Sequence, residues 1–187
     1  MKRRRFLRGA GSALVATGAT AVAGAPSVIA QPQFRWRMVP SFSPSVEILY
    51  AGAQRFATVV EELTGGRLKI QVFAPQELVP AGTEFDACSR GEIEMLNSAA
   101  FFWRGREPAF PWFTAVPFGL NAQATYAWFY AGDGLKLWEE AYAPFGLTPR
   151  PGGSTGVQMG GWFRRKVSQL ADFKGLKLRM PGLGGRV

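Results

Sequence analysis

Histidine is absent from the 187 residues, and cysteine occurs once, as Cys88. A chain without histidine offers no Ser-His-Asp or Cys-His nucleophilic centre, and it lacks the commonest ligand of catalytic zinc. One cysteine cannot form an intramolecular disulfide, so the fold must depend on its apolar core. Because Cys88 falls within a helical pattern at 83–90, we interpret it as a buried, unreactive thiol.

Acidic residues are missing from the first thirty positions, which hold five of the 22 lysines and arginines. The formal net charge of +9 therefore falls to +4 for the remainder, where basic residues are scattered. No zinc-finger, RNP or helix-turn-helix pattern is visible, so nucleic acid is not expected as a partner.

The first thirty residues have the pattern of a twin-arginine export signal. Arg3 and Arg4 are followed by Arg5 and the apolar pair Phe6-Leu7. The Ala/Gly-rich stretch 9–25 is weakly apolar and too broken by glycine for a good membrane span. Small residues precede Gln31, so we predict cleavage after Ala30 and a periplasmic mature protein. An ordinary secretory signal or an uncleaved anchor is the alternative.

The next hundred residues have the periodicity of an α/β fold. A strand is predicted at 34–39, a helix at 48–63, a strand at 68–73, a helix at 83–90 and a short strand at 93–96. Strands that alternate with helices in this way are usually parallel. The strand at 34–39 alternates apolar and basic residues, which predicts one buried and one exposed face.

A proline-broken aromatic stretch at 101–120 is predicted to be an irregular loop, and helices are expected at 122–130 and 134–142. The turn-rich crossing at 144–153 predicts a lobe boundary, with lobe I at 31–152 and the first part of lobe II at 153–187.

In that second region we predict a strand at 157–163, a short helix capped by Ser168, and a strand at 176–180. Two strands are too few to cover a sheet, so we expect this lobe to be incomplete and residues 31–187 alone to be marginally stable.

Two sequence blocks indicate a protein family more specifically than the periodicity does. They read TGVQMGGWF at 155–163 and DFKGLKLRMPGLGG at 172–185, and shorter blocks are ELVP at 77–80, FDA at 85–87, VPFGL at 116–120 and YAPFG at 142–146. Together they resemble the extracytoplasmic solute receptors of TRAP transporters, the DctP-type family, and within it the branch that binds 2-oxo acids and related monocarboxylates. The resemblance covers nearly all of residues 33–185.

The resemblance implies a type II periplasmic-binding-protein-like α/β fold with two lobes and a hinge. It implies that Arg179 clamps the carboxylate of the substrate, and that Gln158 binds both substrate and a bridging sodium or calcium ion. Phe101, Phe102, Trp103 and Phe118 are candidate pocket-lining residues, although core packing is the commoner role of aromatic side chains. Relatives often have tyrosine where this chain has Phe101 and Phe102.

From residues alone, Arg179 is one arginine at the end of a predicted strand, where a surface role is the simpler interpretation. Its position favours function, because ligands bind at the carboxyl ends of strands in open α/β sheets and guanidinium suits carboxylate. Gln158 alone is equally well explained as a structural amide, although its oxygen suits sodium or calcium.

The favoured function is therefore a non-catalytic periplasmic receptor that binds a small monocarboxylate, such as pyruvate or lactate, and delivers it to the membrane subunits of a TRAP transporter. An input domain of a sensor is the first alternative, and a periplasmic enzyme on the same fold is the second. No nucleophile with an evident base supports the enzyme. Whether the protein forms a homodimer is left open.

Overall fold

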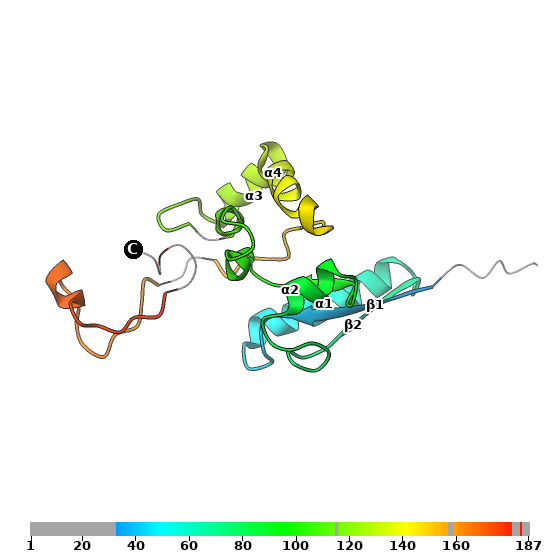
Figure 1. Ribbon diagram of the computed structural model, residues 1–187, viewed down its shortest axis with the longest axis horizontal. Coiled ribbons are helices and arrows are strands. Elements are labelled where there is room, and N and C mark those ends of the chain that lie inside the picture. Colours follow the sequence, from blue (N-terminus) through cyan, green and yellow to red (C-terminus); the bar gives the residue numbers. More distant parts are fainter. Residues whose placement is uncertain (1–32, 115, 157–158, 181–183, 185–187) are drawn as a thin grey trace, which may run out of the picture. The chain divides into compact units, whose positions relative to one another are not determined.

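The computed structural model describes residues 33–114, 116–156, 159–180 and 184 (Figure 1). The predicted export signal and Gln158 lie outside these described residues.

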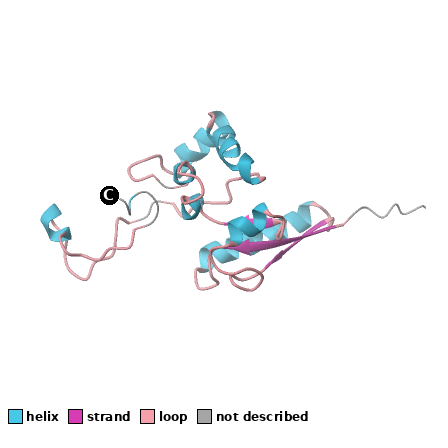
Figure 2. Cartoon of the chain, viewed as in Figure 1, coloured by secondary structure: helices cyan, strands magenta, loops and turns pink. Residues whose placement is uncertain are grey.

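A three-stranded parallel sheet forms the centre of the first region (Figures 1 and 2). Its strands are β1 (Phe34–Pro40), β2 (Leu68–Val72) and β3 (Met95–Asn97), in the order β2-β1-β3. Met38 of the central strand is in register with Val72 on one side and Met95 on the other. The predicted parallel β-α-β unit is confirmed, with boundaries that differ from the prediction by one or two residues.

Helices cover both faces of this sheet at its carboxyl end. Helix α1 (Glu47–Leu63) packs Ala53 and Ala57 into a cluster with Met38. Helix α2 (Glu84–Ser89) packs Ala87 into a separate cluster with Val39. Consecutive residues of a strand point to opposite faces, so the two clusters lie on opposite sides of β1.

This double cover overturns the predicted exposure pattern of β1. Met38, Val39 and Pro40 are all buried, whereas Phe34 and Trp36 are 56% and 37% exposed. A central strand covered on both faces buries consecutive residues instead of alternate ones. Cys88 lies half-buried beside the α2 cluster, and burial raises the pKa of its thiol, as expected of an unreactive cysteine.

A second core is built almost entirely from aromatic side chains. Phe85 of α2 is fully buried at its centre, and its ring lies 5.1–5.8 Å from four others: Trp103, Phe110, Tyr142 and Phe145. These come from α4 (Gly134–Tyr142) and three short 3-10 turns, η1 (Ala100–Trp103), η2 (Phe110–Phe113) and η3 (Ala143–Phe145). Helix α3 (Ala122–Ala131) packs beside α4 and adds Phe129.

The aromatic stretch is therefore less irregular than predicted, because η1 and η2 form within it. In the part of the chain that the structure describes, no helix is long and apolar enough to cross a membrane.

The second region differs from its prediction. Residues 159–163 and 176–180 form no strand, and the only helical turn among residues 159–180 is η4 (Leu170–Phe173). A strand needs a hydrogen-bonded neighbour, and the described residues provide none there. The residue that caps η4 is Gln169, not Ser168, and the Asp172 carboxylate accepts hydrogen bonds from the backbone N–H groups of both.

Candidate functional site

Polar groups meet where β1 and β3 end. Ser41 follows β1 and Ser98 follows β3, and their hydroxyl oxygens lie 2.8 Å apart. The Ser41 backbone N–H donates to the Asn97 carbonyl oxygen at 2.8 Å, which extends the strand pairing by one residue and fixes the two loops together. The carboxyl ends of parallel strands are where open α/β sheets bind ligands.

Ser98 is the better placed of the two hydroxyls to meet a ligand. Its oxygen accepts hydrogen bonds from the Ser41 hydroxyl and from Nε1 of Trp103, the latter at 3.1 Å. With both acceptor positions filled, the hydroxyl hydrogen of Ser98 is left to donate. A donor held in this way suits a carboxylate or keto oxygen.

Aromatic residues follow both serines along the chain. The Phe42 and Phe102 rings lie 5.8 Å apart, and the Phe101 and Phe102 rings lie 4.5 Å apart. Phe102 is 42% exposed and Phe101 is half-buried. Trp103, predicted to line a pocket, belongs to the aromatic core, and only its indole N–H reaches the serines.

Phe118, the fourth aromatic candidate, is fully exposed, and its backbone adopts a φ of 58°. Among the described residues, no ring contact joins it to the Phe42–Phe101–Phe102 group. The structure therefore brings together Phe101 and Phe102 but not Phe118.

The crossing into the second region passes beside the end of β3. A Cβ atom added to Gly152 would lie 3.5 Å from the side-chain nitrogen of Asn97. Just before it, Arg150 pairs with Glu139 of α4 at 2.5 Å and also donates to the carbonyl of Pro149. The crossing is thus joined to α4 by an ion pair and passes close to Asn97 at the end of β3.

Arg179, the predicted carboxylate clamp, is exposed in an irregular segment. Its guanidinium makes no hydrogen bond or ion pair with another described residue. Gln158, the predicted metal ligand, lies outside the described residues. Those residues contain no group of three Cys, Asp or Glu side chains that could hold a metal ion.

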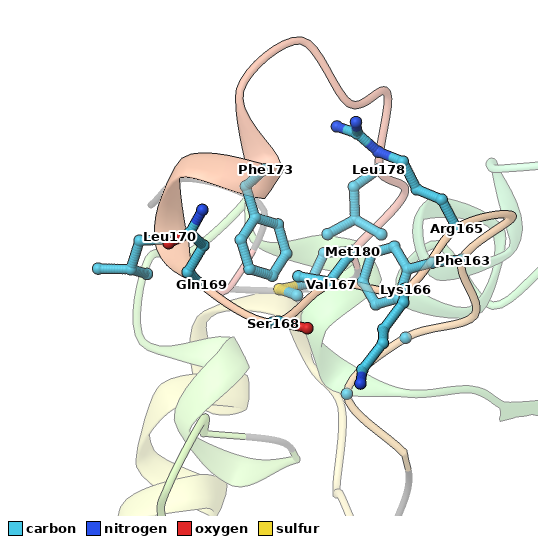
Figure 3. A pocket seen from close by; sticks show the side chains of 12 residues that line it. Phe163, Arg165, Lys166, Val167, Ser168, Gln169, Leu170, Phe173, Leu178 and Met180 are labelled. Carbon is cyan, nitrogen blue, oxygen red and sulfur yellow. The ribbon is translucent and has the colours of Figure 1, made fainter.

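Two hollows of the described surface lie elsewhere. An open groove of about 710 Å³ is lined by residues between 160 and 180 (Figure 3), and a smaller hollow of about 260 Å³ is bordered by Trp112, Leu120 and Trp128. Neither is lined by Ser41, Ser98 or Arg179. The serines are therefore candidates by chemistry and by their position at the ends of β1 and β3, whereas Arg179 is a candidate by its chemistry alone.

Comparison with known proteins decides the family. The family model of the bacterial extracellular solute-binding proteins, family 7, also called DctP, matches residues 41–185. The chain belongs to this family. Its fold is the type II periplasmic-binding fold of the TRAP solute-binding proteins, in agreement with the sequence analysis.

Members of family 7 with curated names or solved structures agree with this assignment. The monocarboxylate 2-oxoacid-binding periplasmic protein of a Nostoc species is 43% identical over 193 residues, which span all of this chain and 52% of the relative. A TRAP solute-binding protein of Pseudoalteromonas atlantica, solved with sodium and pyruvate, is 40% identical with a TM-score of 0.77. One from Colwellia psychrerythraea, solved with calcium and pyruvate, is 36% identical with a TM-score of 0.78.

Each of these two structural matches covers 82% of this chain and 47% of the relative. The chain thus spans about half the length of the relatives it matches.

Sequence reasoning missed Ser41 and Ser98. A signal was present, since each serine lies two residues beyond a predicted strand, in the region where open α/β sheets bind ligands. Neither serine stands out by type, and only the pairing of β3 with β1 brings them together.

Proposed function

We propose that this protein is a periplasmic receptor that binds a small monocarboxylate, with a 2-oxo acid such as pyruvate favoured and lactate next, and delivers it to the membrane subunits of a TRAP-type transporter. The observation that carries the proposal is the 36–40% identity to receptors solved with pyruvate and a metal ion. The Nostoc relative, named for 2-oxo acid binding, adds support across the whole chain.

The chemistry of the described residues suits an anionic ligand with a second oxygen. Arg179 presents a guanidinium that pairs with no other described residue, and such a group can hold a carboxylate through two parallel hydrogen bonds. Ser98 offers a hydroxyl donor for a further oxygen, and Phe102 an apolar surface for a small carbon chain.

Gln158 is the proposed contribution of this chain to a sodium or calcium site. Its amide oxygen is a neutral, hard ligand of the kind that both ions accept. A bound ion would supply positive charge for the keto and carboxylate oxygens.

Export by the twin-arginine pathway completes the proposal, with residues 1–30 as the signal and a lobe boundary near residue 152. Replacing both Arg3 and Arg4 by lysine is expected to keep the protein in the cytoplasm. The N-terminus of the exported protein is expected at Gln31. Unchanged export of the double variant would remove the twin-arginine assignment.

The test of ligand binding uses a full-length chimera, in which residues 31–187 of this chain replace the matched part of the Nostoc relative. Titration calorimetry with pyruvate is expected to show binding that depends on sodium or calcium. Pyruvamide, which has the same shape but no carboxylate, is the matched control and is expected not to bind. The proposal would be contradicted if the chimera bound pyruvate and pyruvamide equally well, or if it bound neither.

Gln158→Ala in the chimera is expected to weaken pyruvate binding less than loss of Arg179, because it removes one ligand of several. It is also expected to change the dependence on the cation. A variant with unchanged cation dependence would rule out Gln158 as a metal ligand.

A further inference from the structure

The hydrogen bond between Trp103 and Ser98 joins the aromatic core to the end of β3. Trp103 is 8% exposed, and its ring lies 5.4 Å from the ring of Phe85, which is fully buried. The η1 turn brings the indole back toward the strand end, so that its Nε1 lies 3.1 Å from the Ser98 hydroxyl oxygen. Because packing in the core holds the indole ring, the direction of its N–H group is held as well.

The indole also sets which way the hydrogen bonds run. An indole N–H can donate but cannot accept, whereas a serine hydroxyl can do either by rotating. The Ser98 oxygen accepts from Trp103 and from the Ser41 hydroxyl, so both of its lone pairs are occupied. Among the described residues the Ser98 hydroxyl hydrogen has no acceptor. Ser98 therefore offers a ligand a donor and no acceptor.

Of the two donors, Trp103 is the one that prevents this arrangement from reversing. The Ser41 hydroxyl is half-buried and can rotate toward another acceptor or water. The indole N–H is buried and held in place, so it would be left without a partner if Ser98 accepted from a ligand instead. A buried donor that loses its acceptor is unfavourable.

We infer that Trp103 is a positioning residue that makes the site select 2-oxo acids over 2-hydroxy acids, because it holds Ser98 as a donor. The inference rests on the proposed function, since it concerns the ligand of the same site. Arg179 is the group proposed to hold the carboxylate, which leaves the oxygen on the second carbon of the ligand for Ser98. Ser98 follows β3 at the carboxyl edge of the sheet, where ligands bind in folds of this class.

The two kinds of acid differ at that oxygen by one hydrogen. A keto oxygen has lone pairs and no hydrogen, so it accepts from Ser98 and brings no donor of its own. The hydroxyl of a 2-hydroxy acid brings a hydrogen, and the Ser98 oxygen has no lone pair left to receive it. A ligand whose polar group stays unpaired in the site binds more weakly.

Titration calorimetry of the chimera with pyruvate and with L-lactate tests the inference. The unaltered chimera is expected to bind pyruvate more tightly than lactate. Trp103→Phe is expected to lower the ratio of the two affinities about three- to tenfold, because Ser98 then has a lone pair for the lactate hydroxyl. A variant that only loosens the aromatic core would weaken the binding of both acids and leave the ratio unchanged.

Trp138→Phe is the matched control for Trp103→Phe. Trp138 packs against the same aromatic core, and its buried indole nitrogen bonds neither serine. This variant is expected to keep the ratio of the unaltered chimera. A double variant, Ser98→Ala with Trp103→Phe, is expected to have the same ratio as Ser98→Ala alone, because Trp103 acts on the ligand only through Ser98.

A second measurement needs no ligand. In nitrogen-15 NMR spectra of the full chain, the Trp103 indole signal is the one that Trp103→Phe removes. Ser98→Ala is expected to make the hydrogen of this indole exchange with water about tenfold faster or more, because it removes the acceptor. An unchanged exchange rate would show that Ser98 does not hold the indole, and it would overturn the inference.

The titrations separate this inference from the proposed function. A chimera that binds pyruvate no more tightly than lactate, or whose ratio responds equally to Trp103→Phe and Trp138→Phe, overturns the inference and leaves the receptor function intact. A chimera that binds neither acid contradicts the proposed function and, with it, the selectivity assigned to Trp103.

Discussion

Residues 33–150 and residues 159–180 are both rich in apolar side chains, but only the first region buries them. In the first region, Met38, Val39 and Phe85 are at most 1% exposed, because two helices cover the sheet and aromatic turns cover α2. In the second region Trp162 is 86% exposed and no strand forms. The comparison teaches that apolar periodicity produces regular structure only where a hydrogen-bonded neighbour and a covering layer are present.

The largest effect is expected from Phe85→Ala, and it is an effect on the stability of the first region. Phe85 is fully buried among four aromatic rings, and removal of such a ring typically costs about 3–5 kcal/mol of unfolding free energy. Phe173→Ala, in the second region, is the matched control and is expected to leave the unfolding of residues 33–150 unchanged. Urea unfolding of the chain measures both. Similar losses from the two variants would show that the regions form one cooperative core.

The next largest effect is expected from Arg179→Ala, and it is an effect on pyruvate affinity. In the chimera, loss of a charged partner for the carboxylate is expected to cost about 2–5 kcal/mol, roughly thirty- to several-thousand-fold in pyruvate affinity. Arg179→Lys is expected to bind poorly too, because an ammonium cannot reproduce the planar two-bond contact.

Lys177→Ala is the control for Arg179, because it removes the same charge two residues away. Calorimetry with pyruvate compares the two. An Arg179→Ala chimera within about threefold of the unaltered affinity, less than ~1 kcal/mol, would show that the carboxylate is anchored by another residue.

A smaller effect is expected from Ser98→Ala at the end of β3. The change removes the hydroxyl proposed to meet the ligand and the acceptor for Trp103. A single hydrogen bond contributes about 0.5–1.5 kcal/mol, so pyruvate affinity in the chimera should fall about two- to tenfold. Ser43→Ala, at an exposed serine whose hydroxyl contacts only the Ser45 hydroxyl among the described residues, is expected to have no effect. Equal affinities of the two variants would remove Ser98 from the site.

The smallest effect concerns the exposed pair of Arg37 and Glu94. Two guanidinium hydrogen bonds and the Arg37 backbone N–H lower the pKa of the Glu94 carboxyl from an ordinary value near 4.5 to about 2. A carboxyl with a lowered pKa in the folded state stabilises the fold above about pH 4.5, and this contribution is lost as pH falls toward 2.

Glu94→Gln is therefore expected to make the stability of the fold fall less steeply between these pH values. The effect should be much smaller than that of Phe85→Ala, because the pair is exposed. Arg37→Lys, which keeps the charge but not the two-bond geometry, is expected to have an intermediate effect. Urea unfolding midpoints of the unaltered chain and of both variants, measured from pH 6 to pH 2, test this prediction. An unchanged pH profile in Glu94→Gln would contradict the role of this pair.

The sequence was sufficient to place the β-α-β unit of the first region because each of its elements carries its own signals. The helical spacing of α1 and its Gly65-Gly66 stop, together with the alternation of Leu68, Ile70 and Val72, predicted the β-α-β unit. The sequence could not show that β1 is the central strand, so the burial of consecutive residues at Met38, Val39 and Pro40 was missed.

The second region shows where such reasoning fails. Leu176, Leu178 and Met180 alternate as well as the residues of β2 do, yet they form no strand, because pairing is a property of the neighbour and not of the segment. The same limit applies to the site. Arg179 was predicted from a family resemblance, whereas the Ser41–Ser98 pair depends on a strand order that no local pattern encodes.

Hydrogen exchange of the chain alone, read by mass spectrometry, tests the contrast between the two regions most directly. Amides of α1 and β1 are expected to be protected by several orders of magnitude, because they belong to a covered sheet. Amides of residues 159–180 are expected to exchange at nearly the rate of an unfolded peptide, except those that donate to the Asp172 carboxylate or to the backbone carbonyls of residues 169–173. Comparable protection in both regions would contradict the account.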